Sequence, residues 1–325
     1  MAIHRNASAA TIGAVAVMVM LPILTAAQAV FNPKDWDGRL GPGAKSWIAE
    51  RDTLPPYTPP RTADGQPNLQ GRWGGTWSGD DIELIPKFLD ITTPPWESYV
   101  STPADGKIPY QPWARQERIA HREGLGREAW SEDPTRRLYY DPQAFCLKGV
   151  PRYSQRGYEL VQTKDTVIEM LNWGHIYRVI PLVNRPLPAD SVRTWMGVAR
   201  GHFEGDTLVI ETTNQNGKMW LDSGGNYIGR NAKVTERLRL VGPNDLDYQA
   251  TIDDPETFTQ PWTLTARQRR QGAGGRGGGG GNAVRDPYAA ESWEHACHEG
   301  NSEHEEDIKK LGFKWYTAPV PPARK

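Results

Sequence analysis

Apolar and polar positions alternate along the chain from Gly157 to Arg270. Within that region, runs of five to nine residues rich in Val, Ile, Thr, Tyr and Leu are bounded by Gly, Asn and Asp, which is typical of β-strands with one buried face. The pattern predicts eight strands, namely Tyr158–Gln162, Thr166–Leu171, His175–Ile180, Trp195–Phe203, Asp206–Thr213, Lys233–Leu240, Leu246–Ile252 and Pro261–Arg267.

Several connections between these strands are only two or three residues long, namely Thr163–Asp165, Asn172–Gly174, Glu204–Gly205 and Gly242–Asn244. Such short turns join sequential antiparallel neighbours. Eight strands in a meander can close on themselves and leave room for side chains or one small ligand. We therefore expect a mainly β fold, an antiparallel up-and-down barrel over residues 157–270, with an open sheet or a two-sheet sandwich as the alternative.

The residues before the strands are predicted to pack on the barrel without forming a domain of their own. Residues 30–156 begin with a proline-rich extended arm and continue as an irregular segment. Within this segment we expect a short strand in Leu69–Trp77 and a helix at Trp113–Glu123. The turn-rich stretch Asp141–Arg152 is expected to cover a barrel mouth.

The residues after the strands divide into two parts. Residues 271–286 contain the low-complexity run Gln271–Asn282, which has no apolar side chain to bury beyond a single Ala and is expected to be a flexible insertion. Residues 287–325 form a predicted helical tail, in which a helix over Tyr288–Leu311 stops at Gly312.

The N-terminal residues 1–29 are predicted to be a secretory signal. Arg5 precedes the apolar run Thr11–Ala26, and Ala27-Gln28-Ala29 fits a small-x-small cleavage site. The run is short for a transmembrane helix, which needs about 20 residues. We expect a periplasmic or secreted protein with no stable membrane anchor after cleavage. In an oxidising compartment Cys146 and Cys297 form either one disulfide or two separate thiols, and the sequence leaves both open.

Composition narrows the class of partner. The net charge is −1 with 24% charged residues, so no basic excess points to nucleic acid. Thirteen Trp and twelve Tyr exceed six Phe, and such side chains either fill a β-rich core or line pockets for small aromatic or carbohydrate ligands. A small-molecule ligand is therefore the expected partner.

Strand alternation places charged residues among apolar ones. Glu169 shares a strand face with Val167 and Leu171, Arg178 with Ile176 and Ile180, Glu211 with Val209, and Glu236 with Val234, Leu238 and Leu240. A charge on an apolar face must be paired or become neutral. We expect Arg178 to meet Glu169, Glu211 and Glu236 in the interior, as a ligand grip with a general acid or base. A purely structural ion-pair network, or a solvated face, is the alternative.

The other face of the same strand carries His175 and Tyr177, the best acid–base pair by residue type. The candidate catalytic set is therefore His175, Tyr177, Arg178, Glu211 and Glu236. No cofactor or metal site is predicted. The tail order His-Ala-Cys-His-Glu at 295–299 is not the His-Glu-x-x-His of zinc hydrolases, and neither a nucleotide fingerprint nor a Gly-x-Ser-x-Gly elbow occurs.

Several motifs in a fixed order resemble a family of exported acidobacterial and proteobacterial proteins of unknown function. They span Arg61 to Asn301 and are RTADGQPNLQGRW, YQPWA, CLKGVPR, GHFEGDTLVIETTN, VTERLRL, TIDDPETFTQPWT and ACHEGN. The resemblance implies a lipocalin-like barrel but no activity. Its candidate positions are Arg152, Asp206, Thr207, Glu236, Arg237, Trp262, Cys297, His298, Glu299 and Asn301.

Three functions remain open from the sequence. The first is an exported barrel that binds, and converts without a cofactor, a small aromatic or carboxylated molecule by lyase, isomerase or hydrolase chemistry. The second is a carrier that binds such a ligand without turnover. The third is an envelope interaction protein that uses the proline-rich arm and the Gly-rich insertion as contact segments.

Overall fold

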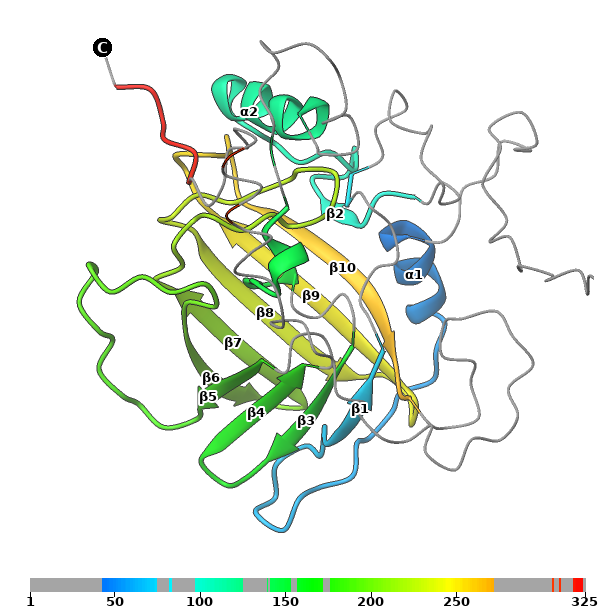
Figure 1. Ribbon diagram of the computed structural model, residues 1–325. Helices are drawn as coiled ribbons and strands as arrows, with labels where there is room; N and C mark the ends of the chain where they lie inside the picture. The colour runs from blue at the N-terminus through cyan, green and yellow to red at the C-terminus, as the bar shows by residue number, and fades with distance from the viewer. Residues whose placement is uncertain are drawn as a thin grey trace, which may run out of the picture.

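The protein is mainly β, with two antiparallel sheets and few helices in the computed structural model (Figure 1). The structure describes residues 43–74, 82–83, 97–124, 139, 141–152, 157–171, 176–271, 306, 310 and 318–323. The predicted signal segment 1–29 therefore lies outside the described residues, as do nearly all of the Gly-rich insertion and of the helical tail.

The larger sheet has six strands in the order β2-β10-β9-β8-β7-β6. Its members are β2 (Val100–Thr102), β6 (Val198–Glu204), β7 (Thr207–Thr213), β8 (Lys233–Leu240), β9 (Asp245–Asp253) and β10 (Trp262–Arg269). Strands β6 to β10 follow one another as antiparallel neighbours, and Gly205 adopts φ 58° in the turn between β6 and β7. A residue with a Cβ is strained in that conformation, which explains the glycine.

The smaller sheet has four strands in the order β1-β3-β4-β5. Its members are β1 (Gly71–Trp73), β3 (Tyr158–Gln162), β4 (Thr166–Leu171) and β5 (Tyr177–Pro181). All eight strands predicted from alternation are present, with ends that differ by at most three residues. Strand β1 lies within the predicted Leu69–Trp77, whereas β2 is too short to show an alternating pattern and was not predicted.

The predicted meander is interrupted between β5 and β6, which belong to different sheets. Residues 182–197 connect them, and so long a connection does not force its two strands to pair, as the hairpin turns do. No closed barrel is found among the strands that the structure describes. The two sheets do meet at one edge, where Trp73 bridges to Arg270 and the Gly74 N–H donates to the Arg269 carbonyl at 2.6 Å.

The hydrophobic core lies between the two sheets. On β10 the even-numbered residues Trp262, Leu264, Ala266 and Gln268 face inward, and the same period holds on β8 and β9. From the smaller sheet, Tyr158, Leu160, Val167, Leu171 and Ile180 join the same core. The charged residues Glu169, Arg178 and Glu236, which strand alternation predicted to face inward, lie in this interior.

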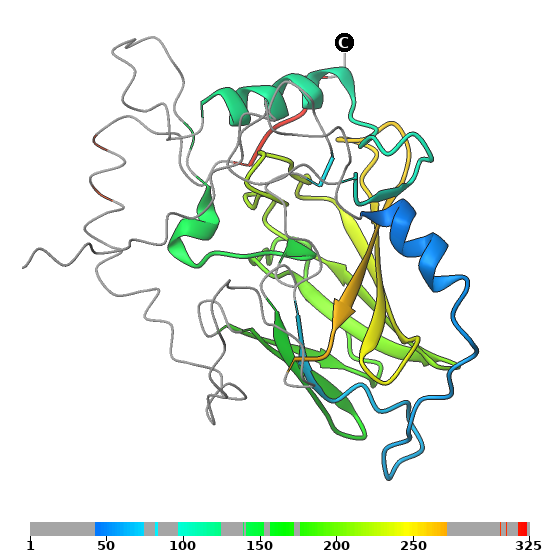
Figure 2. The ribbon, with the colours of Figure 1, turned by 90° about the vertical axis from the view of Figure 1, so that its right-hand side faces the viewer.

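Helix α1 (Ala44–Arg51) packs on the outer side of the larger sheet, next to β10 (Figure 2). The Trp47 indole N–H donates to Asp247 at 2.8 Å, and Arg51 forms an ion pair with the same carboxylate at 3.2 Å. The sequence predicted an extended arm here, because this helix has no apolar stripe. Individual polar contacts hold the helix on the sheet, and a periodic pattern of apolar residues does not predict such contacts.

Helix α2 (Pro112–Glu123) confirms the predicted helix within one residue, with Pro112 at its first turn. It lies at one end of the molecule, above the upper ends of β7 and β8 in Figure 1, and the short 3-10 helix η4 (Pro142–Phe145) lies below it. Among the described residues, no helix is long and apolar enough to span a membrane.

Candidate functional site

The predicted charges Arg178, Glu169 and Glu236 meet between the two sheets. Strand pairing places Glu169 on β4 directly opposite Arg178 on β5, and Glu236 approaches from β8 of the other sheet. Arg178 donates through Nη1 to Glu169 at 3.0 Å and through Nη2 to Thr212 at 2.5 Å, and Nη2 also forms an ion pair with Glu236 at 2.7 Å. These contacts join the two sheets by charge as well as by apolar packing.

Two tyrosines complete this group. The Tyr248 hydroxyl donates to the second oxygen of Glu236 at 2.7 Å, and the Tyr158 hydroxyl donates to Gln268 at 2.5 Å. Burial raises the pKa of Tyr158 well above its usual range, and the nearby carboxylates Glu169 and Glu236 raise it further. We call these seven residues (Tyr158, Glu169, Arg178, Thr212, Glu236, Tyr248 and Gln268) the interior cluster.

The interior cluster is closed to solvent. The Arg178 side chain is 3% exposed, and those of Glu169 and Glu236 are 0% exposed. A guanidinium between two carboxylates can hold a charge in a dry interior only because all three are paired. The geometry favours the structural ion-pair alternative, since a ligand would first have to displace one of these contacts.

The remaining predicted catalytic residues do not join this cluster. Tyr177 is 69% exposed, because its neighbour Arg178 takes the inward position of β5 and the next residue must point outward. The Glu211 side chain is 43% exposed and pairs with Lys233 at 2.6 Å, because Thr212 takes the inward position on β7. The expected meeting of Glu211 with Arg178 is therefore wrong. His175 lies outside the described residues.

A second buried polar group lies at the end of the molecule beside α2. It is organised by the connection between β7 and β8, residues 214–232, which has no named helix or strand and is nevertheless mostly buried. Long irregular loops usually run over the surface, because buried backbone groups need hydrogen-bond partners. A buried loop of this length is uncommon and is typical of functional segments.

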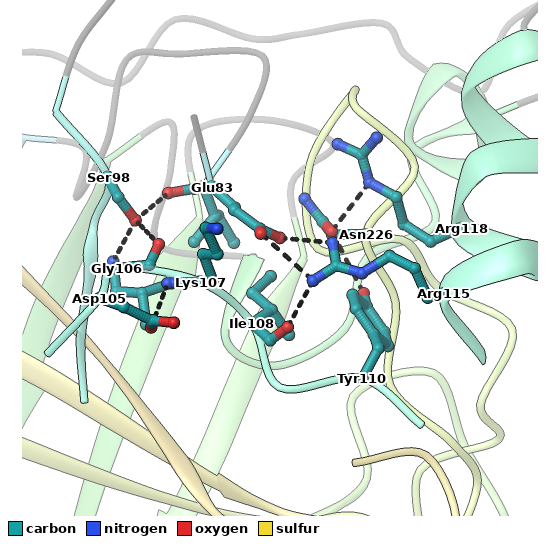
Figure 3. Close-up of polar contacts among 12 residues, drawn as sticks. Glu83, Ser98, Asp105, Gly106, Lys107, Ile108, Tyr110, Arg115, Arg118 and Asn226 are labelled. Atoms are coloured by element: carbon teal, nitrogen blue, oxygen red, sulfur yellow. Dashed lines mark hydrogen bonds and ion pairs between the residues drawn. The ribbon is translucent and has the colours of Figure 1, made fainter. Parts of the chain in front are cut away.

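Side chains supply many of those partners. Asp222 accepts hydrogen bonds from the Ile82 N–H at 2.6 Å, the Asn226 N–H at 3.0 Å and the Asn226 side-chain amide at 2.7 Å. The Asn226 oxygen in turn accepts from Tyr110 at 3.2 Å and from Arg118 of α2 at 3.1 Å (Figure 3). The loop is therefore held to α2 and to the segment before it through one carboxamide.

Aromatic rings surround His121 on the same side of α2. The imidazole stacks on Trp220 with 4.8 Å between ring centroids and 21° between planes, and it meets Tyr139 and Tyr227 edge-on. One ring nitrogen lies 3.0 Å from the Gly225 carbonyl. Burial raises the pKa of Tyr227 strongly, and the same cause raises that of Tyr110. The loop cluster is defined as Tyr110, Arg118, His121, Tyr139, Trp220, Asp222, Asn226 and Tyr227.

Polar contacts at the edge of the loop cluster fix helix α2. Arg115 forms a two-bond pair with the buried Glu83, at 2.9 and 3.2 Å, and its Nη2 donates to the Ile108 carbonyl at 2.6 Å (Figure 3). The same guanidinium lies over the Tyr110 ring, 4.9 Å from its centroid. Ser98 closes the adjacent turn by donating to the Gly106 carbonyl at 2.6 Å.

The turn-rich stretch 141–152 packs against the β7–β8 loop. Arg152 forms a two-bond pair with Asp141, at 2.7 and 2.6 Å, and also donates to the Trp220 carbonyl at 3.2 Å. The Val150 N–H donates to Gln215 at 3.1 Å. Cys146 in this stretch is disulfide-bonded, so the open question about that thiol is resolved, and Cys297, the only other cysteine of the chain, lies outside the described residues.

The candidate positions taken from the family resemblance are dispersed. Glu236 belongs to the interior cluster, Arg152 lies beside the loop cluster, and Trp262 is buried on the inner face of β10. Asp206 and Arg237 form ion pairs on the surface, with Arg61 and Glu204. The positions in the tail, Cys297 to Asn301, lie outside the described residues. Within the described part of the chain, no group of three potential metal ligands occurs.

Sequence reasoning missed the loop cluster. One signal was present, since Ala114, Arg118 and His121 occur at helical spacing and form the buried face of α2. A second was the run Met219-Trp220-Leu221 inside a Gly- and Asn-rich loop, where apolar residues have no reason to occur unless they are buried. No protein-family model, curated protein or solved structure matches the chain.

Proposed function

We propose that the protein is an exported carrier that binds a small aromatic or carboxylated molecule at the loop cluster. The observation that carries this proposal is the stack of His121 on Trp220, with two tyrosine edges around it and the buried guanidinium of Arg118 on the same helix face. Small-molecule sites commonly combine aromatic walls with a few placed polar groups.

The architecture supports this location. The loop cluster is assembled from α2, Tyr110 in the segment before it, residue 139 and the β7–β8 loop, and binding sites are often built in this way from loops on a scaffold of regular elements. The barrel predicted from the strand count is part of the proposal: the bridge from Trp73 to Arg270 joins the sheets on one side, and β5 lies beside β6 on the other (Figure 1). Such an arrangement leaves the loop-covered end as the natural entrance.

A thermal-shift titration with benzoate, phenylacetate and indole-3-acetate tests the proposal. A ligand that binds only the folded state raises Tm with concentration, because it stabilises by RT ln(1 + [L]/Kd). We expect at least one acid to raise Tm in the wild type and in His202→Leu, which alters an exposed histidine of β6. The same acid should have no effect on His121→Leu. If no acid raises Tm, or if His121→Leu responds as the wild type does, binding at the loop cluster is ruled out.

Conversion of the ligand without a cofactor is the second candidate, and it requires that the ligand displace one of the contacts of the interior cluster. Tyr248 donates to Glu236, and Glu236 pairs with Arg178, so a proton donor, a carboxylate and a cation lie in contact. Product analysis by mass spectrometry decides between the two. A product that is formed by the wild type and lost in Glu236→Gln or Arg178→Ala, with ligand binding retained, supports an enzyme. Binding without any product supports the carrier.

A further inference from the structure

Three buried polar atoms lie along the seam between residues 141–152 and the start of the β7–β8 loop. They are Gln143 Oε1, Arg152 Nε and Gln215 Nε2, and none has a hydrogen-bond partner within the part of the chain that the structure describes. The three residues are 7%, 1% and 0% exposed. Buried polar groups nearly always have hydrogen-bond partners in folded proteins. Three buried atoms without a partner among the described neighbouring residues therefore indicate a bound ligand.

Hydrogen bonds place the three residues close together. One oxygen of Asp141 accepts from both the Gln143 N–H at 3.0 Å and the Arg152 Nη1 at 2.7 Å. Gln215 is bound to the backbone of Val150, two residues before Arg152, at 3.1 Å. Because its oxygen accepts from a backbone N–H, the orientation of the Gln215 amide is fixed, and its Nε2 group must be the donor that remains.

The seam therefore offers two donors and one acceptor. A carboxylate accepts from the guanidinium Nε–H of Arg152 and from the amide of Gln215, since charge-assisted bonds to Arg are among the strongest in proteins. The remaining acceptor, Gln143 Oε1, requires a donor, which a carboxylate lacks and a hydroxyl provides. The combination matches a carboxylate with an adjacent hydroxyl.

The seam is continuous with the loop cluster through Trp220. Arg152 donates to the Trp220 carbonyl at 3.2 Å, while the indole of the same residue stacks on His121. We propose that the seam binds the polar end of an aromatic 2-hydroxy acid, whose ring occupies the loop cluster. This inference rests on the proposed function and specifies the class of its ligand.

Matched pairs of acids test the inference by isothermal titration calorimetry on the full chain. The pairs are phenylacetate with mandelate and 3-phenylpropanoate with 3-phenyllactate, and they differ only in the 2-hydroxyl. We expect the hydroxylated acid of each pair to bind about tenfold more tightly, because one buried hydrogen bond contributes about that factor.

Two variants separate the parts of the site. Gln215→Glu keeps the oxygen that accepts from Val150 but removes the donors, so both acids of each pair should bind about tenfold more weakly or worse. Gln143→Leu should equalise the acids within each pair, since only the hydroxyl loses its partner. Gln260→Glu, at an exposed position before β10, should bind as the wild type does and serves as the matched control.

The possible outcomes are distinct. Equal binding within each pair, or binding unaffected by Gln215→Glu in a variant that keeps its Tm, overturns the hydroxy-acid site while leaving the proposed function intact. Failure of all four acids and of the earlier panel overturns both. A crystal structure with mandelate that shows ordered water only at Gln143, Arg152 and Gln215 likewise overturns the inference.

Discussion

The interior cluster and the loop cluster are both buried and both mix charges with aromatic rings, but they are built in opposite ways. The interior cluster lies on regular strands, where every second side chain faces the core. The loop cluster lies on one helix face and an irregular loop, where hydrogen bonds to single side chains hold the backbone. The interior cluster joins the two sheets, and the loop cluster joins helix α2 to the β7–β8 loop.

The difference extends to energetics. In the interior cluster, removal of one partner leaves a full charge unpaired in a dry region, which is among the costliest single changes in proteins. In the loop cluster, the contacts are individual hydrogen bonds and ring stacks, so the cost of any one change is smaller and falls on local geometry. Ligand binding requires contacts that can be broken at low cost, so we expect it at the loop cluster.

The largest expected effect is that of Arg178→Ala. The substitution leaves Glu169 and Glu236 buried without their common cation, so the free energy of unfolding should fall by about 3–5 kcal/mol. Urea denaturation monitored by Trp fluorescence measures it. The matched control is Arg237→Ala on β8, whose ion pair with Glu204 is exposed to solvent, so its loss should change the free energy of unfolding little. Equal losses for the two arginines would contradict the structural role of the interior cluster.

The next effect is expected in the loop cluster with Asp222→Ala. Three N–H donors, two of Asn226 and one of Ile82, lose their buried acceptor, which should lower the free energy of unfolding by about 2–3 kcal/mol. Asp222→Asn keeps one acceptor oxygen and should lose less. Hydrogen exchange measured by mass spectrometry should show faster exchange confined to the β7–β8 loop and α2. Faster exchange across both sheets would instead mean that the loop stabilises the whole fold.

The stability of the protein at alkaline pH should show how strongly each of the two clusters excludes water. Burial raises the pKa of Tyr158 in the interior cluster and of Tyr110 and Tyr227 in the loop cluster, so the folded protein keeps these protons while the unfolded chain loses them above pH about 10. Stability should therefore fall as pH rises through that value, by up to about 1.4 kcal/mol per pH unit for each tyrosine.

Tyr158→Phe and Tyr227→Phe should each make that decline shallower, as measured by urea denaturation between pH 9 and 11. Similar reductions would mean that both regions exclude water alike. No change with Tyr227→Phe would show that the loop cluster opens to water before the sheets separate, a result expected of a site that admits a ligand.

Sequence alone predicted the parts of the fold that depend on period. Alternation located the strands and placed Glu169, Arg178 and Glu236 inward, because a β-strand has a period of two regardless of its partners. It could not show that β5 and β6 would belong to different sheets, since their long connection leaves pairing undetermined. The loop cluster was only partly accessible for a related reason. Local pattern can mark Trp220 as buried, but it does not show that Trp220, Asp222 and Asn226 contact α2 and residue 82.

The smallest expected effect is that of Glu211→Gln, which sharpens the comparison within the predicted catalytic set. Glu211 pairs with Lys233 at the surface, so the substitution should lower the free energy of unfolding by less than about 0.5 kcal/mol. Glu236→Gln removes a buried charge that Arg178 requires and should cost several times more. Both are the same chemical change on adjacent strands, measured in one urea series. Equal losses in the free energy of unfolding for the two substitutions would mean that Arg178 does not require the charge of Glu236. Glu236 would then be available as a catalytic carboxylate.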